Sequence, residues 1–215
     1  MPIFMFTDIE GSTRLWEKRP KAMGQVLARH DAILQKRIEE YGGSVIKHMG
    51  DGVFAVFEEG EPVRCALEIQ KQLRKEEWGA IAVLRVRIAL HAGDAEKRGG
   101  DYFGSVVNRT WRTMSAGRGG QILLTPEVVK ASDLPAQAGL QDLGVHWFKG
   151  LREPQRILGL VHPDLGRQGF SPLRVRSARP CLVRQTAVEN LPARKGYAGC
   201  FLLAGVQSRA YAVLH

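Results

Sequence analysis

The sequence predicts an α+β fold in which helices pack on a mostly antiparallel sheet. Strand-like and helical segments alternate along the first 163 residues of the 215-residue chain, and two pairs of adjacent strand-like runs have the pattern of hairpins. Hydrophobic residues make up 44% of the chain, which is enough to bury a core. The predicted order is strand, helix, strand, strand, helix, strand, which is a ferredoxin-like βαββαβ core. An αβββ-type extension follows this core.

The first half of the core follows from its hydrophobic pattern. An apolar run predicts a strand over residues 2–9, and helical periodicity then continues to about Tyr41. Pro20 predicts a break that divides this stretch into a short helix and a longer one. Residues 44–57 form two strand-like runs around a Gly-Asp-Gly turn, which is a hairpin signal.

The second half is predicted in the same way. The expected elements are a helix over 62–75, a strand over 82–93, a helix over 105–116, a strand over 119–125, a short helix over 126–132 and a closing hairpin within 140–163. In the strand over 82–93, Arg85 and Arg87 alternate with apolar residues and face one side. We expect the helices to cover one face of the sheet.

Composition disfavours several classes of protein. No stretch of 18 apolar residues exists, so a membrane span is not expected, and the N-terminus lacks the charged region and cleavage site of a secretion signal. The three cysteines, Cys65, Cys181 and Cys200, have no metal-ligand spacing and point to neither a disulfide framework nor a zinc site. We therefore expect a cytoplasmic location.

The net charge of +9 is concentrated at the C-terminal end. Residues 166–215 contain eight Lys and Arg and one Glu, a net charge of +7, whereas residues 1–165 contain 23 basic and 21 acidic residues, a net charge of +2. A nearly neutral body lacks the basic face of a DNA-binding domain, so nucleic acid is not the expected partner. We expect a folded domain over 1–162 and a basic tail over 163–215 that is disordered or loosely docked.

Two acidic residues stand where predicted strands end. Asp8 follows the apolar run of the first strand, and Asp51 lies at the tip of the predicted hairpin. If these strands are neighbours, the two carboxylates meet at one sheet edge, where they repel each other unless a cation lies between them. Mg²⁺ is the natural cation, because it takes hard oxygen ligands and brings phosphates with it. The alternatives are an N-cap role for Asp8 and an ordinary turn role for Asp51.

A second polar group lies on the helix predicted over 105–116. Asn108 and Arg112 are four residues apart and therefore share one face of that helix. Asparagine can orient a ribose oxygen, and arginine can neutralise the charge that grows on a phosphoryl group. The alternative is an ordinary solvated helix face.

Several motifs together resemble one family. The chain is similar to the class III nucleotide cyclase catalytic domain, that is, the catalytic domain of adenylate and guanylate cyclases, and most similar to the bacterial branch that begins "FTDIEGST". The motifs cover roughly residues 1–162 in the order found in the family, and they are "FTDIEGST", "KHMGDGVFAVF", "IALHAGD", "DYFGSVVNRTWRTMSAG", "GGQILLT" and "LGVHWFKGL".

The resemblance implies roles for residues of the metal and base sites. Asp8 and Asp51 match two carboxylates that bind metal, and the Ile9 carbonyl matches a backbone ligand of the metal. Lys47 and Asp101 match the pair that recognises the adenine edge. The chemistry agrees, because lysine only donates hydrogen bonds and ionised aspartate only accepts them. Adenine offers an acceptor and a donor on that edge, and guanine offers the reverse pattern.

The resemblance also implies a shared site. Asn108 and Arg112 match the pair that stabilises the transition state, and Lys149 matches a lysine that binds the triphosphate. Family members are dimers in which one subunit contributes the metal aspartates and the other contributes the Asn and Arg. One departure from the family is Trp111, a bulky residue beside Arg112 where small residues are usual.

The expected function is that of an adenylate cyclase. In this reading a homodimer with two Mg²⁺ or Mn²⁺ ions per site converts ATP into 3′,5′-cyclic AMP and pyrophosphate. The first alternative is another phosphoryl-transfer enzyme with paired acids, such as a nucleotidyltransferase. A second is a catalytically weak or silent nucleotide-sensing module that dimerises, and a third is nucleic-acid binding through the basic tail.

Overall fold

The computed structural model describes residues 1–166 and 172–175, which all belong to the first of two compact units, residues 1–185. Of the predicted tail over 163–215, it describes only 163–166 and 172–175. The elements in chain order are β1 (Ile3–Ile9), α1 (Ser12–Lys18), α2 (Pro20–Glu40), β2 (Ser44–His48), β3 (Val53–Phe57), α3 (Pro62–Lys75), the 3₁₀ turn η1 (Gly79–Ile81), β4 (Val86–Ala92), β5 (Glu96–Arg98), β6 (Asp101–Phe103), α4 (Ser105–Ala116), β7 (Ile122–Leu124), α5 (Pro126–Ala131), β8 (Gly139–His146), β9 (Gln155–Val161) and the 3₁₀ turn η2 (Pro163–Leu165).

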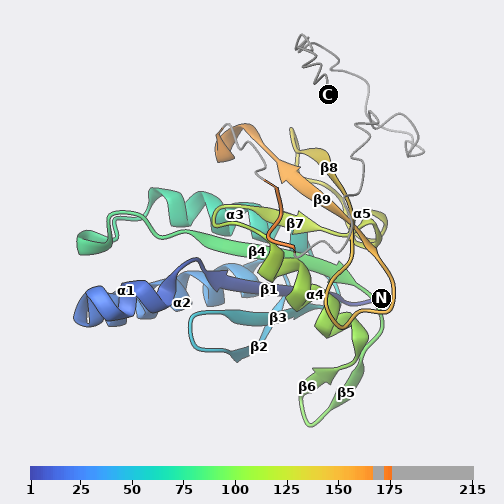
Figure 1. The fold of residues 1–215 in the computed structure, drawn as a ribbon, viewed down its shortest axis with the longest axis horizontal. Helices are drawn as coiled ribbons and strands as arrows, with labels where there is room; N and C mark the ends of the chain where they lie inside the picture. The colour runs from blue at the N-terminus through green and yellow to red at the C-terminus, as the bar shows by residue number, and fades with distance from the viewer. Residues whose placement is uncertain (167–171, 176–215) are drawn as a thin grey trace, which may run out of the picture. The chain divides into compact units, whose positions relative to one another are not determined.

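The predicted α+β class is confirmed by a seven-stranded sheet in the order β2-β3-β1-β4-β7-β9-β8 (Figure 1). Neighbouring strands are antiparallel except β4 and β7, which are parallel. β1 is central, between β3 and β4, so both of its edges are paired, and its side chains Phe4 and Met5 are completely buried. The register of β1 against β4 places Asp8 directly opposite Arg87.

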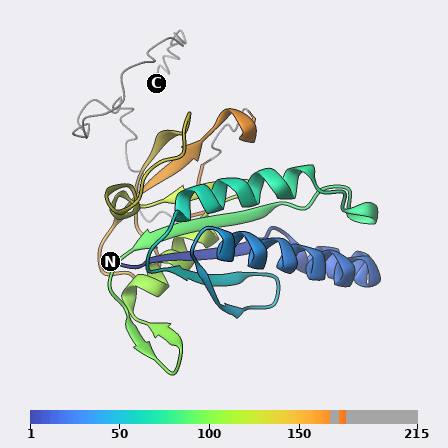
Figure 2. The same cartoon turned by 180° about the vertical axis from the view of Figure 1, so that it is seen from behind.

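Helices cover both faces of the sheet (Figures 1 and 2). On one face, Met5 of β1 joins a core cluster with Leu34 of α2 and Leu67 of α3. On the other face, Phe4 joins a second cluster with Met114 of α4. The expectation that helices cover one face is therefore wrong. Successive side chains of β1 point to opposite faces, and because both sets are apolar, both faces need a covering layer.

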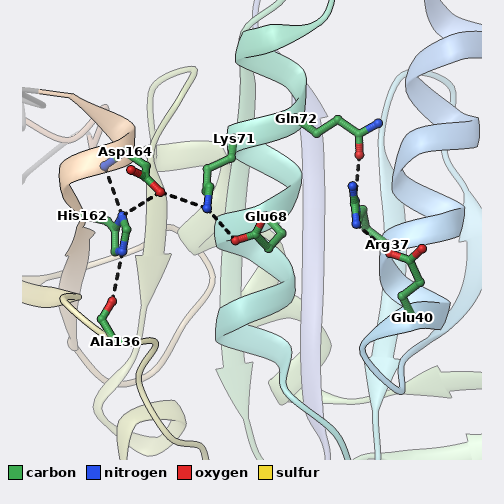
Figure 3. Close-up of polar contacts among 8 residues, drawn as sticks. All are labelled: Arg37, Glu40, Glu68, Lys71, Gln72, Ala136, His162 and Asp164. Carbon is green, nitrogen blue, oxygen red and sulfur yellow. Dashed lines mark hydrogen bonds and ion pairs between the residues drawn. The ribbon is translucent and has the colours of Figure 1, made fainter.

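Polar contacts join α2 and α3 on the side away from α4. Arg37 Nε donates a hydrogen bond to Gln72 Oε1 (2.7 Å), and an Arg37 guanidinium nitrogen pairs with Glu40 (2.7 Å; Figure 3). Arg29 of α2 forms an ion pair with Glu76, just after α3 (2.8 Å). In the described part of the chain, no helix has the length and the apolar character needed to cross a membrane.

Two local features differ from the predictions. The glycine-rich stretch at Gly99 and Gly100 is the turn of a short hairpin, β5–β6, and both glycines have positive φ angles of 56° and 82°. This hairpin was not predicted, and it places Asp101 at the start of β6. The strand predicted over 82–93 begins only at Val86, because the 3₁₀ turn η1 and a positive φ of 28° at Ala82 precede it.

The turn η2 is anchored on α3 (Figure 3). Lys71 of α3 pairs with Asp164 (2.9 Å) and with Glu68 (2.8 Å). His162 Nδ1 accepts the Asp164 backbone N–H (3.2 Å), so the ring proton is on Nε2, which donates to the Ala136 carbonyl (3.0 Å). Residues 163–165 are therefore part of the folded domain.

Buried His91 of β4 makes the stability of the domain depend on pH. Its ring lies 2.7 Å from Thr125 Oγ1, and burial lowers its pKa from 6.5 to about 4, although the Glu127 carboxylate 3.7 Å away opposes the shift. Between these two pH values the unfolded chain binds the proton and the folded chain does not. The free energy of unfolding should therefore fall by about 3 kcal/mol between pH 7 and pH 4.

Urea unfolding of wild type and His91→Gln at pH 7, 5.5 and 4.5 checks this expectation. The variant should lose most of the decrease, because glutamine does not titrate. An equal slope in wild type and His91→Gln would show that another group is responsible.

Candidate active site

Asp8 and Asp51 lie on segments that are bonded to each other. The Ile9 N–H donates a hydrogen bond to the Asp51 carbonyl (3.3 Å), which joins the end of β1 to the turn between β2 and β3. A Cβ at Gly52 would clash with the Thr7 carbonyl oxygen, so this close approach requires a glycine. The two acidic residues, 43 positions apart in the sequence (51 − 8), therefore converge at one edge of the sheet.

The Asp8 carboxylate is neutralised by Arg87, its partner across the β1–β4 register. Both side chains are largely buried, with exposed fractions of 15% for Asp8 and 17% for Arg87. Arg87 Nη1 also lies 3.5 Å from the Ser115 carbonyl at the end of α4. Burial lowers the pKa of Arg87, and the nearby charge of Arg174 lowers it further. The sequence pattern placed Arg87 on one side of a strand but not beside Asp8, because that contact depends on strand pairing.

The donors at this edge fit a divalent ion that also binds phosphate. In the described part of the chain, no group of three or more His, Cys, Asp and Glu side chains could hold a metal ion. Two carboxylates are enough for Mg²⁺ when substrate phosphates and water complete the octahedron. Asp8 already faces one positive group, so a cation bound there would take the place of Arg87 and would not enter an apolar site.

Lys47 of β2 and Asp101 of β6 are in direct contact through an ion pair. The hydrogen bond from Lys47 lowers the pKa of Asp101, and so does the Tyr102 N–H, which donates to Asp101 Oδ1 (2.8 Å). Lys47 is about half exposed, and its Nζ lies 5.7 Å from the centre of the Phe54 ring. A fixed donor and a fixed acceptor thus lie side by side at the surface.

Asn108 and Arg112 are exposed on α4, whose bounds match the predicted helix over 105–116. Trp111 lies between them in the sequence and packs edge-on against Phe6 of β1, with ring centres 5.6 Å apart. The indole therefore covers the sheet and leaves the face of Asn108 and Arg112 open. Within residues 1–166 and 172–175, neither of these two side chains has a hydrogen bond or ion pair.

Lys149 is exposed in the connection between β8 and β9. Its neighbour Phe148 is buried in the cluster under α4, and Glu153 of the same connection pairs with Arg109 of α4 (3.3 Å). The connection is therefore held against α4. Among the described residues, no hydrogen bond or ion pair joins Lys149 to the acidic residues at the sheet edge.

Comparisons with known proteins identify the family of this chain. Residues 3–157 match the model of the adenylate and guanylate cyclase catalytic domain. An uncharacterized protein of Mycobacterium tuberculosis is 34% identical over 181 residues, which cover 82% of this chain and 61% of the relative. The chain thus spans less than two thirds of the length of that relative.

Solved structures with a similar fold include adenylate cyclases. Adenylate cyclases from Trypanosoma brucei, in their monomeric state, superpose with a TM-score of 0.71 and 25% identity, covering 82% of this chain and 94% of theirs. The adenylyl cyclase CyaB from P. aeruginosa gives a TM-score of 0.62 and 25% identity, covering 74% of this chain and 93% of its own. The family model matches most of the chain, and the chain belongs to the adenylate and guanylate cyclase catalytic domain family.

Proposed function

We propose that this protein is an adenylate cyclase, which converts ATP into 3′,5′-cyclic AMP and pyrophosphate. The contact between Lys47 and Asp101 carries this proposal, because it places one donor beside one acceptor. Lysine can donate to the adenine ring nitrogen, and aspartate can accept from the exocyclic amine. Guanine would meet a donor with a donor and an acceptor with an acceptor, so the pair favours ATP over GTP.

The acidic edge is suited to hold two Mg²⁺ or Mn²⁺ ions. Asp8 and Asp51 would bind them with the Ile9 carbonyl, and such ions activate the ribose 3′-hydroxyl and neutralise charge on the leaving pyrophosphate. Arg87 occupies Asp8 in the structure. If Asp8 held a metal ion, the Arg87 guanidinium would be free to bind phosphate oxygens of the substrate.

The remaining residues act on the reacting group from a second subunit. Asn108 would orient the ribose for in-line attack on the α-phosphorus, Arg112 would stabilise the charged transition state, and Lys149 would bind the triphosphate. Their exposure, and their lack of partners within the described residues, support a two-fold homodimer in which each site uses both chains. The cyclase family binds nucleotides and commonly forms dimers, which agrees with this assembly.

The substrate preference can be tested and reversed. Purified protein incubated with ATP or GTP and Mn²⁺ should form cyclic AMP, detected by chromatography. Lys47→Glu combined with Asp101→Ser should shift the ATP-to-GTP ratio of kcat/KM by about 10²-fold or more towards GTP, because the variant presents an acceptor and a hydroxyl donor to guanine.

The matched control is Lys36→Glu with Glu40→Ser, at an exposed ion pair on α2 (3.8 Å), which should keep the wild-type ratio. An unchanged ratio in the Lys47 and Asp101 variant would refute base recognition by this pair. ATP binding by dimeric wild-type protein without any cyclic product would refute the enzyme and favour a nucleotide-sensing module.

A further inference from the structure

A short segment beyond the family match docks beside the candidate active site. This segment, residues 172–175, is called the docked segment below. The Arg174 N–H donates a hydrogen bond to the Ala116 carbonyl at the end of α4 (2.8 Å), and the Arg174 side chain pairs with Glu10 (2.6 Å). The apolar side chains on either side of Arg174 pack against the cluster under α4. The docked segment is therefore held by its backbone, by its charge and by its apolar groups.

Glu10 links the docked segment to the acidic edge. It follows Asp8 by two residues, and its N–H donates to the Arg85 carbonyl (2.8 Å), which fixes its backbone to the residue just before β4. Its side chain is largely buried, with an exposed fraction of 19%. The Arg174 guanidinium therefore neutralises a carboxylate that is partly shielded from solvent.

Arginines also hold the C-terminal end of α4. The last carbonyls of a helix have no partner within the helix, and positive charge near them is favourable. The last turn of α4 contains no basic residue of its own. Arg87 lies 3.5 Å from the Ser115 carbonyl, and the Arg174 N–H binds the Ala116 carbonyl. The Arg87 side chain and the Arg174 backbone, which come from other parts of the chain, thus bind this helix end.

These contacts place Arg174 where it influences both the Asp8–Arg87 pair and the helix α4 of its own chain. With Glu10 neutralised by Arg174, Arg87 is left to pair with Asp8 and to hold α4, the helix that carries Asn108 and Arg112. Without the Arg174 side chain, the unpaired Glu10 carboxylate would compete with Asp8 for Arg87, and Arg87 would then bind the end of α4 less well.

We infer that Arg174, which lies outside the matched residues 3–157, is a positioning residue for the cyclase site. It holds Glu10 and the end of α4 so that Asp8, Arg87 and the α4 side chains keep their arrangement. The inference rests on the proposed function, because the site that Arg174 orders is the one assigned to cyclic AMP formation. Arg174 itself does not touch the reacting atoms.

Kinetics of Arg174 variants test this role. Arg174→Ala should lower kcat about tenfold and change KM for ATP less than about twofold, since misplacing catalytic groups slows the chemical step. Arg174→Lys, which can still pair with Glu10, should recover part of kcat, and Arg174→Glu, which repels Glu10, should be slower than Arg174→Ala. The control is Arg29→Ala, whose ion pair with Glu76 has similar exposed fractions (56% and 20%, against 46% and 19% for Arg174 and Glu10).

Hydrogen exchange provides a readout that does not require activity. Arg174→Ala keeps the backbone N–H but loses the ion pair that anchors the docked segment, so the bond to the Ala116 carbonyl should open more often. Amides in the last turn of α4 should therefore exchange faster in Arg174→Ala than in wild type, and Arg29→Ala should leave them unchanged. If wild type forms no cyclic nucleotide, the proposed function fails, and exchange at the end of α4 still decides whether Arg174 holds this helix. The inference is overturned if exchange there is unchanged, if kcat of Arg174→Ala stays within twofold of wild type, or if kcat rises.

Discussion

Replacement of Asp51 by alanine is expected to lower the rate of cyclic AMP formation by about 10³-fold or more. Asp51 is one of the two acids proposed to bind the metal ions, and its backbone carbonyl binds the end of β1. Removing its carboxylate takes away a metal ligand and leaves the hydrogen bond from the Ile9 N–H in place. The loss should therefore appear in kcat while the fold is retained, measured as cyclic AMP formed from ATP and Mn²⁺.

The control for this variant is Asp133→Ala. Asp133 is an exposed acid in the connection after α5 and should have no effect on the rate. Circular dichroism should show the same secondary structure for wild type and both variants. If Asp51→Ala kept more than about a tenth of the wild-type rate, Asp51 would not be a metal ligand, and its ordinary turn role would explain it.

Mixing two inactive variants should restore activity if the sites are shared between subunits. Asp8→Ala and Arg112→Ala should each lower the rate by about 10²-fold or more, because one removes a metal ligand and the other a charge that stabilises the transition state. In an equal mixture, half of the dimers combine the two variants, and each mixed dimer has one intact site. About a quarter of the wild-type activity should return.

A second mixture is the matched control for this experiment. Asp8→Ala mixed with Asp51→Ala should regain nothing, because both acids of one site come from the same chain. Recovery in the first mixture alone would support a shared site. No recovery in either mixture, with mixed dimers demonstrated by native mass spectrometry, would mean that each chain builds its site alone.

Local patterns were sufficient to predict most of the elements. The helix that carries Asn108 and Arg112 was predicted with the bounds of α4, and the Gly-Asp-Gly turn was predicted as the tip of the β2–β3 hairpin. These predictions succeed because periodicity and turn chemistry act over a few neighbouring residues. The residue types also predicted the chemistry of the site, with two acids suited to bind a cation and a polar pair on one helix.

Three features could not be predicted from local pattern. The second helical layer, formed by α4, depends on both faces of β1 being apolar, which is equally compatible with other arrangements. The pairing of Asp8 with Arg87 depends on the β1–β4 register, which joins residues 79 positions apart. Arg174 lies in a basic stretch without periodicity, so its contact with Glu10 has no local signal.

The sequence by itself determined the α+β class, the order of the elements and the residue types available for chemistry, because these depend on hydrophobic period, turn residues and side-chain donors that act locally. Tertiary structure alone decided which of those residues meet. Contacts such as Lys47 with Asp101, Asp8 with Arg87 and Arg174 with Glu10 join distant segments. Such contacts form only after strand register and the packing of helices against the sheet have been set by burial of the whole apolar core.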